Sequence, residues 1–221
     1  MTNDLQKRVI FGAIALAIFT PFLLAGGMAF QFFVGLLAMI ATAELIKMRR
    51  LAPNSIEGVL AMLASLVLTL PLQNYLTFLP TDGNYTAYAI VVFLLLGATV
   101  FNIGRYNYSD VVFPIASSFY VGIGFHSLVL ARMDGLNKVF FALCLVWATD
   151  IGAYMIGRQF GRRKLLPKVS PNKTVEGFVG GILSAVVVAI IFLIVDKSLL
   201  AGYSFGMILL LVVIFSIFSQ F

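Results

Sequence analysis

Long, almost continuously apolar segments alternate with short polar ones along the whole chain. Eight such segments cover approximately residues 9–25, 28–46, 56–79, 87–103, 111–130, 138–157, 176–195 and 203–221. Several approach the roughly 20 residues that an α-helix needs to cross the hydrocarbon core of a bilayer. Strands of a membrane β-barrel would instead show segments of about 10 residues with alternating character. The pattern therefore predicts an all-α, polytopic membrane helix bundle with about eight transmembrane helices.

The composition supports this prediction. Hydrophobic residues make up 61% of the 221 residues and charged residues only 11%, with a mean hydropathy of +1.04. A soluble domain carries roughly 25% charged residues. We expect one transmembrane domain, 1–221, with polar loops near 47–55 and 158–175. We also expect a tight turn at Gly26 and Gly27, and kinks where Pro21 and Pro71 fall inside apolar segments.

The basic residues predict the orientation of the chain. If the N-terminus is cytoplasmic, twelve of the fifteen lysine and arginine residues fall on the cytoplasmic side. The other three, Arg132, Lys138 and Lys197, fall outside. Cytoplasmic segments of membrane proteins carry such an excess of positive charge, which favours this orientation over its reverse. The twelve are Lys7, Arg8, Lys47, Arg49, Arg50, Arg105, Arg158, Arg162, Arg163, Lys164, Lys168 and Lys173.

One polar stretch, KVSPNKTVEG at residues 168–177, lies between two apolar segments. Pro171 disfavours helix at the residue before it, and the next apolar segment begins at once. Hydroxyls, an amide and Lys173 therefore gather where a helix begins, and free N–H groups there attract anions. A basic loop that touches lipid headgroups is the alternative, but it needs only lysines. The mixed composition favours a phosphate site, although no nucleotide fingerprint is present.

The segment before this stretch contains an aspartate in an apolar run. Asp150, Tyr154 and Gly157 share one helical face by their spacing. A carboxylate within a membrane usually belongs to a functional site or to a buried ion pair. Asp150 is therefore expected either to be part of a site or to pair with a lysine or arginine of the next loop. Glycines spaced by four residues favour close helix packing, or else close approach to a phosphate. They are Gly152, Gly157, Gly161, Gly177, Gly180 and Gly181.

Two polar residues elsewhere have simple interpretations. His126 is the only histidine and lies in an apolar segment, where a hydrogen bond between helices is the expected role. Glu44 and Lys47 are three residues apart near the end of a segment, so we expect an ion pair. The single cysteine, Cys144, excludes an intrachain disulfide.

The stretch TDIGAYMIGRQFGRRKLLPKVSPNKTVEGFVGG resembles the bacterial phosphatidate cytidylyltransferases, also called CDP-diacylglycerol synthases. The N-terminal KRVIFGAIALAIFTPFLLAGG and the AELIKMRR that ends at Arg50 are similar to the family as well. Ile151 stands where the family often has threonine, and Asn172 where it usually has lysine. The resemblance implies that phosphatidate and CTP react to give CDP-diacylglycerol and pyrophosphate, with Mg²⁺ as cofactor.

The resemblance also implies roles for individual residues. Lys173 would hold a phosphate, Glu176 would orient Lys173 or help to hold metal or water, and Asp150 would join the polar network beneath them. These three are the candidate catalytic residues, and the metal ligands stay unassigned. The candidate substrate-binding residues are Ser170, Asn172, Thr174, Arg158, Arg162, Arg163 and Lys164.

The family's acidic C-terminal signature would follow Phe221, so we expect either a truncated enzyme or a degenerate member of the family. In either case the activity of this chain by itself is in doubt. Two other classes of function stay open, namely a transporter or flippase for an anionic substrate and a catalytically inactive membrane scaffold. The enzyme interpretation predicts CTP, phosphatidate and membrane lipid as partners, with no nucleic acid. It also predicts a multi-pass protein of the bacterial plasma membrane with its active face in the cytoplasm, and small-residue spacing permits a homodimer.

Overall fold

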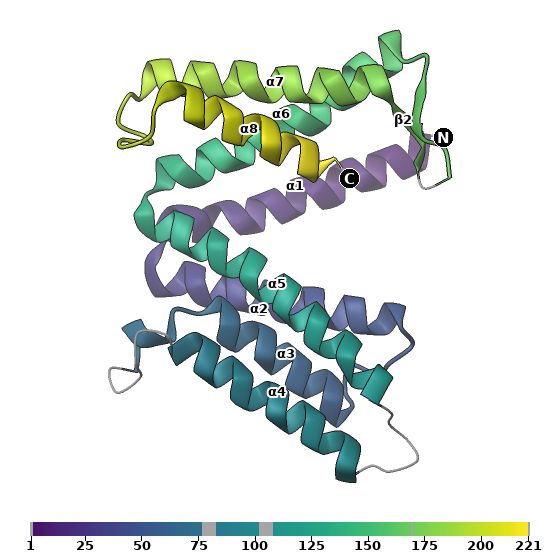
Figure 1. The fold of residues 1–221 in the computed structure, drawn as a ribbon, viewed down its shortest axis with the longest axis vertical. Coiled ribbons are helices and arrows are strands. Elements are labelled where there is room, and N and C mark those ends of the chain that lie inside the picture. Colours follow the sequence, from purple (N-terminus) through teal and green to yellow (C-terminus); the bar gives the residue numbers. More distant parts are fainter. Residues whose placement is uncertain (1, 77–82, 102–107, 169, 221) are drawn as a thin grey trace. The chain divides into compact units, whose positions relative to one another are not determined.

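A computed structural model describes residues 2–76, 83–101, 108–168 and 170–220. Eight α-helices, a one-turn 3₁₀ helix and a short β-hairpin make up these residues (Figure 1). The helices are α1 (Thr2–Ala25), α2 (Gly27–Met48), α3 (Ile56–Thr69), α4 (Gly83–Phe101), α5 (Tyr108–Asp134), α6 (Leu136–Phe160), α7 (Val175–Val195) and α8 (Phe205–Ser219). The 3₁₀ helix is η1 (Leu72–Asn74), and the strands are β1 (Lys164–Leu166) and β2 (Ser170–Thr174).

The predicted all-α membrane architecture is confirmed. Within the described residues, four helices are long and apolar enough to cross a membrane, namely α2, α5 from Asp110, α6 and α7. The other apolar helices are shorter, such as α3 with 14 residues. A helix of that length extends about 21 Å, which is less than the roughly 30 Å of the hydrocarbon core. Crossing by all eight helices therefore stays a prediction.

The chain forms two compact units, Met1–Asp134 and Gly135–Phe221, here called the N-terminal and C-terminal units. The expected single transmembrane domain stays a prediction. In the N-terminal unit, α2, α3 and α5 pack around buried side chains that include Phe30, Val34 and Leu68. His126 Nδ1 of α5 lies 3.1 Å from the Thr69 carbonyl oxygen of α3. The expected hydrogen bond between helices is therefore confirmed.

Local sequence signals explain the helix ends of the N-terminal unit. Gly26 and Gly27 have positive φ angles of 63° and 54° and form the predicted tight turn between α1 and α2. Pro21 lies inside α1 as expected. The predicted segment 56–79 is wrong as one helix, because α3 ends at Thr69 and Pro71 follows it. Proline forces the preceding residue out of the helical region, and Leu70 is extended with ψ 138°.

The C-terminal end of α2, which we predict to be cytoplasmic, contains the expected ion pair. The Lys47 Nζ lies 2.6 Å from the Glu44 carboxylate, which confirms their ion pair. The polar connection continues to Ser55, whose hydroxyl accepts a hydrogen bond from the Gly58 N–H and caps α3. Arg105, which contributes to the predicted charge asymmetry, lies outside the described residues.

In the C-terminal unit, α6 and α7 are joined by the β-hairpin, and α8 packs against both helices (Figure 1). The predicted loop 158–175 is only partly a loop. Helix α6 continues to Phe160, and β1 pairs antiparallel with β2, with Lys164 opposite Thr174 and Leu166 opposite Ser170. Pro171 fits within β2 because a two-stranded hairpin leaves one edge of each strand without a partner.

Glycines set the separation of α6 and α7. A Cβ atom added at Gly152 would lie 2.1 Å from Ser184 Oγ, and one at Gly181 would lie 2.8 Å from the Thr149 carbonyl oxygen. Gly157 and Gly177 face each other across the same contact. Close packing, one of the two interpretations of the glycine spacing, is thus confirmed. These glycines are used within the chain, and the homodimer stays a prediction.

We expect Gly181→Ala to destabilise the protein, because its methyl group would collide with backbone of α6. Overpacking of this kind costs about 1–3 kcal/mol. Gly206→Ala in α8 is the matched control, because nothing lies within 4 Å of a Cβ at that position. Thermal unfolding in detergent measures both variants. A Tm of Gly181→Ala equal to that of Gly206→Ala would contradict the packing argument.

Candidate functional site

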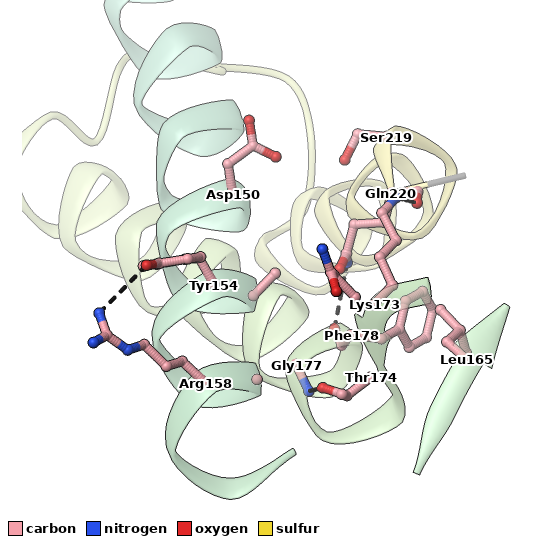
Figure 2. A pocket seen from close by; sticks show the side chains of 13 residues that line it. Asp150, Tyr154, Arg158, Leu165, Lys173, Thr174, Gly177, Phe178, Ser219 and Gln220 are labelled. Atoms are coloured by element: carbon pink, nitrogen blue, oxygen red, sulfur yellow. Dashed lines mark hydrogen bonds between the residues drawn. The ribbon is translucent and has the colours of Figure 1, made fainter. Parts of the chain in front are cut away.

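A cavity of about 420 Å³ opens in the C-terminal unit where four elements meet (Figure 2). Helix α6 contributes one wall, and the start of α7, the hairpin and the end of α8 contribute the others. The lining residues are Asp150, Ala153, Tyr154, Gly157, Arg158, Leu165, Asn172, Lys173, Thr174, Gly177, Phe178, Ser219 and Gln220.

Lys173 brings a positive charge into this cavity. It lies in β2, and its ammonium group donates a hydrogen bond to the backbone carbonyl of Gln220, the residue that ends α8. Carbonyl groups at a helix C-terminus carry partial negative charge, so this contact stabilises both groups. An ammonium group has three N–H donors, so two remain for a ligand.

Gln220 is itself fixed by the start of α7. Its side chain is buried, and its amide donates to the carbonyl oxygens of Ser216 at 3.1 Å and Phe178 at 3.3 Å. The carbonyl that Lys173 contacts is therefore held in place by two helices. The position of the ammonium group follows from helix packing, and it does not depend on the hairpin alone.

Thr174 starts α7. Its buried side-chain oxygen accepts a hydrogen bond from the Gly177 N–H at 3.1 Å, as an N-cap residue does. A Cβ at Gly157 would lie 3.0 Å from this oxygen, so α6 closes over the cap without touching it with a side chain. The helix begins where the sequence predicts, and Gly177 and Phe178 of its first turn line the cavity. The positive end of the α7 dipole therefore contributes to the site.

Glu176 has partners other than Lys173. Its carboxylate accepts hydrogen bonds from the backbone N–H of Arg162 at 3.0 Å and from that of Arg163 at 3.2 Å. These N–H groups follow the end of α6 at Phe160, where the chain turns toward β1. The structure thus places Glu176 as an anchor for this turn, outside the cavity lining.

Asp150 and two neighbours one and two turns further along α6 form the opposite wall. Asp150, Tyr154 and Gly157 all line the cavity, as their spacing predicts. Among the described residues, no side chain forms an ion pair or a hydrogen bond with the Asp150 carboxylate. The Arg158 guanidinium donates to the Tyr154 hydroxyl at 3.4 Å (Figure 2). The site therefore contains an acidic group and two basic ones that are available to a ligand.

Comparison with known sequences shows which family the chain belongs to. A model of the cytidylyltransferase family matches residues 6–221. The chain belongs to the cytidylyltransferase family. Proteins named phosphatidate cytidylyltransferase from Staphylococcus haemolyticus and Staphylococcus saprophyticus are each 38% identical over 217 residues, which is 98% of this chain and 81% of the relative. The protein of that name from Staphylococcus aureus is 34% identical over the same shares. The resemblance seen in the motifs is confirmed.

About half of the candidate site residues predicted from the sequence line the cavity. It brings together Asp150, Arg158, Asn172, Lys173 and Thr174. The others lie outside the lining, on the turn after α6, in the hairpin or in the first turn of α7, and they are Arg162, Arg163, Lys164, Ser170 and Glu176.

Sequence reasoning missed the contribution of α8. Ser219 and Gln220 line the cavity, although they end a segment that is otherwise apolar. The adjacent pair of polar side chains at the end of such a segment was the available signal. Phe178 of α7 also lines the cavity, but nothing in the sequence distinguishes it from the other phenylalanines of the chain, which has 21 in all.

The cap of α7 can be tested by removing one hydroxyl. We expect Thr174→Val to lose roughly 1 kcal/mol of stability, because the Gly177 N–H would lose its acceptor. Thr174→Ser keeps that oxygen and is the control. Chemical or thermal unfolding in detergent compares the two variants. Equal losses in both would show that the hydroxyl does not stabilise the helix.

Proposed function

We propose that this chain is a phosphatidate cytidylyltransferase. It transfers the cytidylyl group of CTP to phosphatidate, and it releases CDP-diacylglycerol and pyrophosphate. The observation that carries this conclusion is the cavity where Lys173, Arg158 and Asp150 meet at the start of α7. It lies in a chain of the cytidylyltransferase family, whose relatives named phosphatidate cytidylyltransferase match 98% of it.

The reaction joins two anions, so charge neutralisation is the main demand on the protein. An oxygen of the phosphatidate phosphate attacks the α-phosphorus of CTP. The bond from that phosphorus to the oxygen that bridges to the β-phosphate then breaks, and pyrophosphate leaves with the electron pair. Lys173, Arg158 and the N-terminus of α7 face the space where negative charge would accumulate. Cations and dipoles held in place before the reaction stabilise such charge most effectively.

The remaining candidate residues support two tasks around this centre. Asn172 and Thr174 line the cavity and would donate hydrogen bonds to phosphate oxygens. The Thr174 hydroxyl can do so while its oxygen caps α7, because a hydroxyl both donates and accepts. Outside the cavity, basic side chains on the turn and β1 would attract the lipid headgroup. They are Arg162, Arg163 and Lys164, and Ser170 at the far end of the hairpin would add a hydroxyl.

Glu176 acts in this proposal as a positioning residue. It holds the backbone N–H groups of Arg162 and Arg163, which fixes the turn that presents their side chains. A carboxylate that accepts two backbone hydrogen bonds is already occupied in part, so it is a poor choice for orienting Lys173. The acidic residue free to meet a ligand in the cavity is Asp150.

Mg²⁺ is part of the proposal through the family resemblance. Proteins bind this ion through one or two carboxylates together with substrate phosphates. Asp150 is one such carboxylate, but the described residues contain no group of three or more His, Cys, Asp or Glu side chains. Asp150 would therefore hold the ion together with the substrate phosphates, whose negative charge the ion would neutralise.

The proposed location is the bacterial plasma membrane, with the cavity open to the cytoplasm. The support is the charge asymmetry, since six of the twelve basic residues assigned to the cytoplasmic side lie between Arg158 and Lys173. CTP is a soluble nucleotide, and phosphatidate is a lipid. A cavity at the end of a membrane helix can be reached by both.

We expect Lys173→Ala to abolish most of the activity. Loss of one fixed group that stabilises transition-state charge lowers the rate by roughly 10²–10³. The measurement uses membranes with this chain, phosphatidate, Mg²⁺ and CTP labelled in the cytidine, and it counts label that enters the lipid. Lys197→Ala, between α7 and α8, is the matched control. Label that enters lipid equally with both variants would exclude Lys173 from the reaction, and no label with the unaltered chain would favour the inactive scaffold.

Asp150→Asn tests the acidic group separately. If Asp150 helps to hold the cation, the variant should need about tenfold more Mg²⁺ for half-maximal activity, because an amide binds this ion more weakly than a carboxylate. The same assay, titrated with Mg²⁺, gives this value. An unchanged Mg²⁺ requirement with lowered activity would assign Asp150 to the polar network instead.

A further inference from the structure

A second cavity lies in the N-terminal unit, between the start of α2 and the end of α5. Its volume is about 280 Å³. It lies at the opposite end of α2 from the basic residues Lys47, Arg49 and Arg50. The proposed reaction uses none of its residues. They are Gly27, Phe30 and Gln31 of α2, with Val129, Arg132 and Met133 of α5.

Arg132 is a fixed cation in this cavity. Its Nε donates to the Leu23 carbonyl at 2.7 Å, and one terminal nitrogen donates to the Leu24 carbonyl at 3.1 Å. Both carbonyls belong to the last turn of α1. A Cβ at Gly26 would lie 2.5 Å from the same guanidinium group, so a side chain there would displace this group. These two hydrogen bonds use two of the five N–H groups of the guanidinium.

Gln31 adds an amide group to the lining of this cavity. The side chain is only 7% exposed, and its oxygen accepts a hydrogen bond from the Tyr75 hydroxyl. That contact fixes the orientation of the amide. Its nitrogen has no hydrogen-bond acceptor among the described residues. These N–H groups can therefore donate to an acceptor that enters the cavity.

The start of α2 contributes further positive potential. This helix has 22 residues, and its N-cap residue, Gly26, makes no side-chain hydrogen bond to the first turn. The N–H groups of that turn therefore lack a side-chain acceptor, and Gly27 lies at the cavity. A helix N-terminus, a guanidinium group and an amide N–H all favour the same kind of ligand, an oxyanion.

We propose that this cavity binds the phosphate group of an anionic phospholipid. The surroundings select a lipid, because exposed apolar side chains lie beside the polar groups. Met133 lines the cavity and is 49% exposed, while Leu24 and Met28 next to the turn are 55% and 62% exposed. These side chains would contact acyl chains. The charge asymmetry predicts that this end of α2 faces outward, so the lipid would belong to the outer leaflet.

The test measures how the Tm of the purified chain in detergent rises as lipid is added. Phosphatidylglycerol, phosphatidylcholine and inorganic phosphate are titrated in parallel. We expect phosphatidylglycerol to stabilise the protein at the lowest concentration. Arg132→Gln should raise its half-saturating concentration about tenfold or more, since charge-assisted hydrogen bonds to phosphate are lost. Arg49→Gln, at the other end of α2, is the matched control and should behave like the unaltered chain.

A second variant keeps the test decisive if Arg132→Gln fails to fold. Gln31→Glu preserves the size of the side chain and the acceptor for Tyr75, and it leaves the contacts of Arg132 with α1 in place. It adds a negative charge to the cavity, which should repel phosphate and neutralise Arg132. We expect the same loss of phosphatidylglycerol binding as in Arg132→Gln.

Two outcomes would overturn the proposal. Unchanged phosphatidylglycerol binding in both variants would show that the lipid binds elsewhere. Stabilisation by inorganic phosphate at equal concentration, lost in Arg132→Gln, would assign the cavity to a free anion in place of a lipid. Neither outcome depends on cytidylyltransferase activity, so the proposed function stands or falls separately.

Discussion

The candidate active site depends on the close approach of α6 and α7. Lipid offers helices no hydrophobic gain on association, so their contact must come from close packing of small residues. Gly152 and Gly181 supply that contact along the helices, and Gly157 faces Gly177 at the end that carries the site. Ala153 and Gly157 of α6 therefore lie against the first turn of α7, and Asp150 and Arg158 line the cavity beside this contact. A side chain at either glycine of the end pair would separate the two walls of the cavity.

The end of this helix pair concentrates groups whose charges complement one another. Thr174 caps the positive end of α7, and Lys173, one residue earlier, reaches the negative end of α8 through the Gln220 carbonyl. A phosphate that enters the cavity would meet an ammonium group that is already oriented. The Gln220 carbonyl holds the Lys173 ammonium group where it can donate to a phosphate oxygen instead. Binding of an anion thus requires little rearrangement of the protein.

The hairpin and the turn before it extend the site outward. Glu176 anchors the backbone of Arg162 and Arg163 from the first turn of α7, so the basic turn is tied to the same helix that begins the cavity. The N-terminal unit repeats this use of helix ends in a different way. There Arg132 satisfies the last carbonyls of α1 and lies beside the open start of α2. In both units, polar groups gather where helices end, since backbone groups there lack partners within the helix.

The sequence by itself determined the class of protein, most helix positions and the start of α7. Apolar length, glycine spacing and the mixed polar stretch are local signals in the sequence. Lipid limits the structures that such segments can form, because backbone groups there must form hydrogen bonds within each helix. The tertiary structure alone decided that Ser219 and Gln220 join Lys173, although 47 residues separate Lys173 from Gln220. It also decided that Glu176 binds the turn after α6, and that β1 pairs with β2. Contacts between segments far apart in the sequence depend on how the helices pack, and a local pattern of residues does not determine this packing.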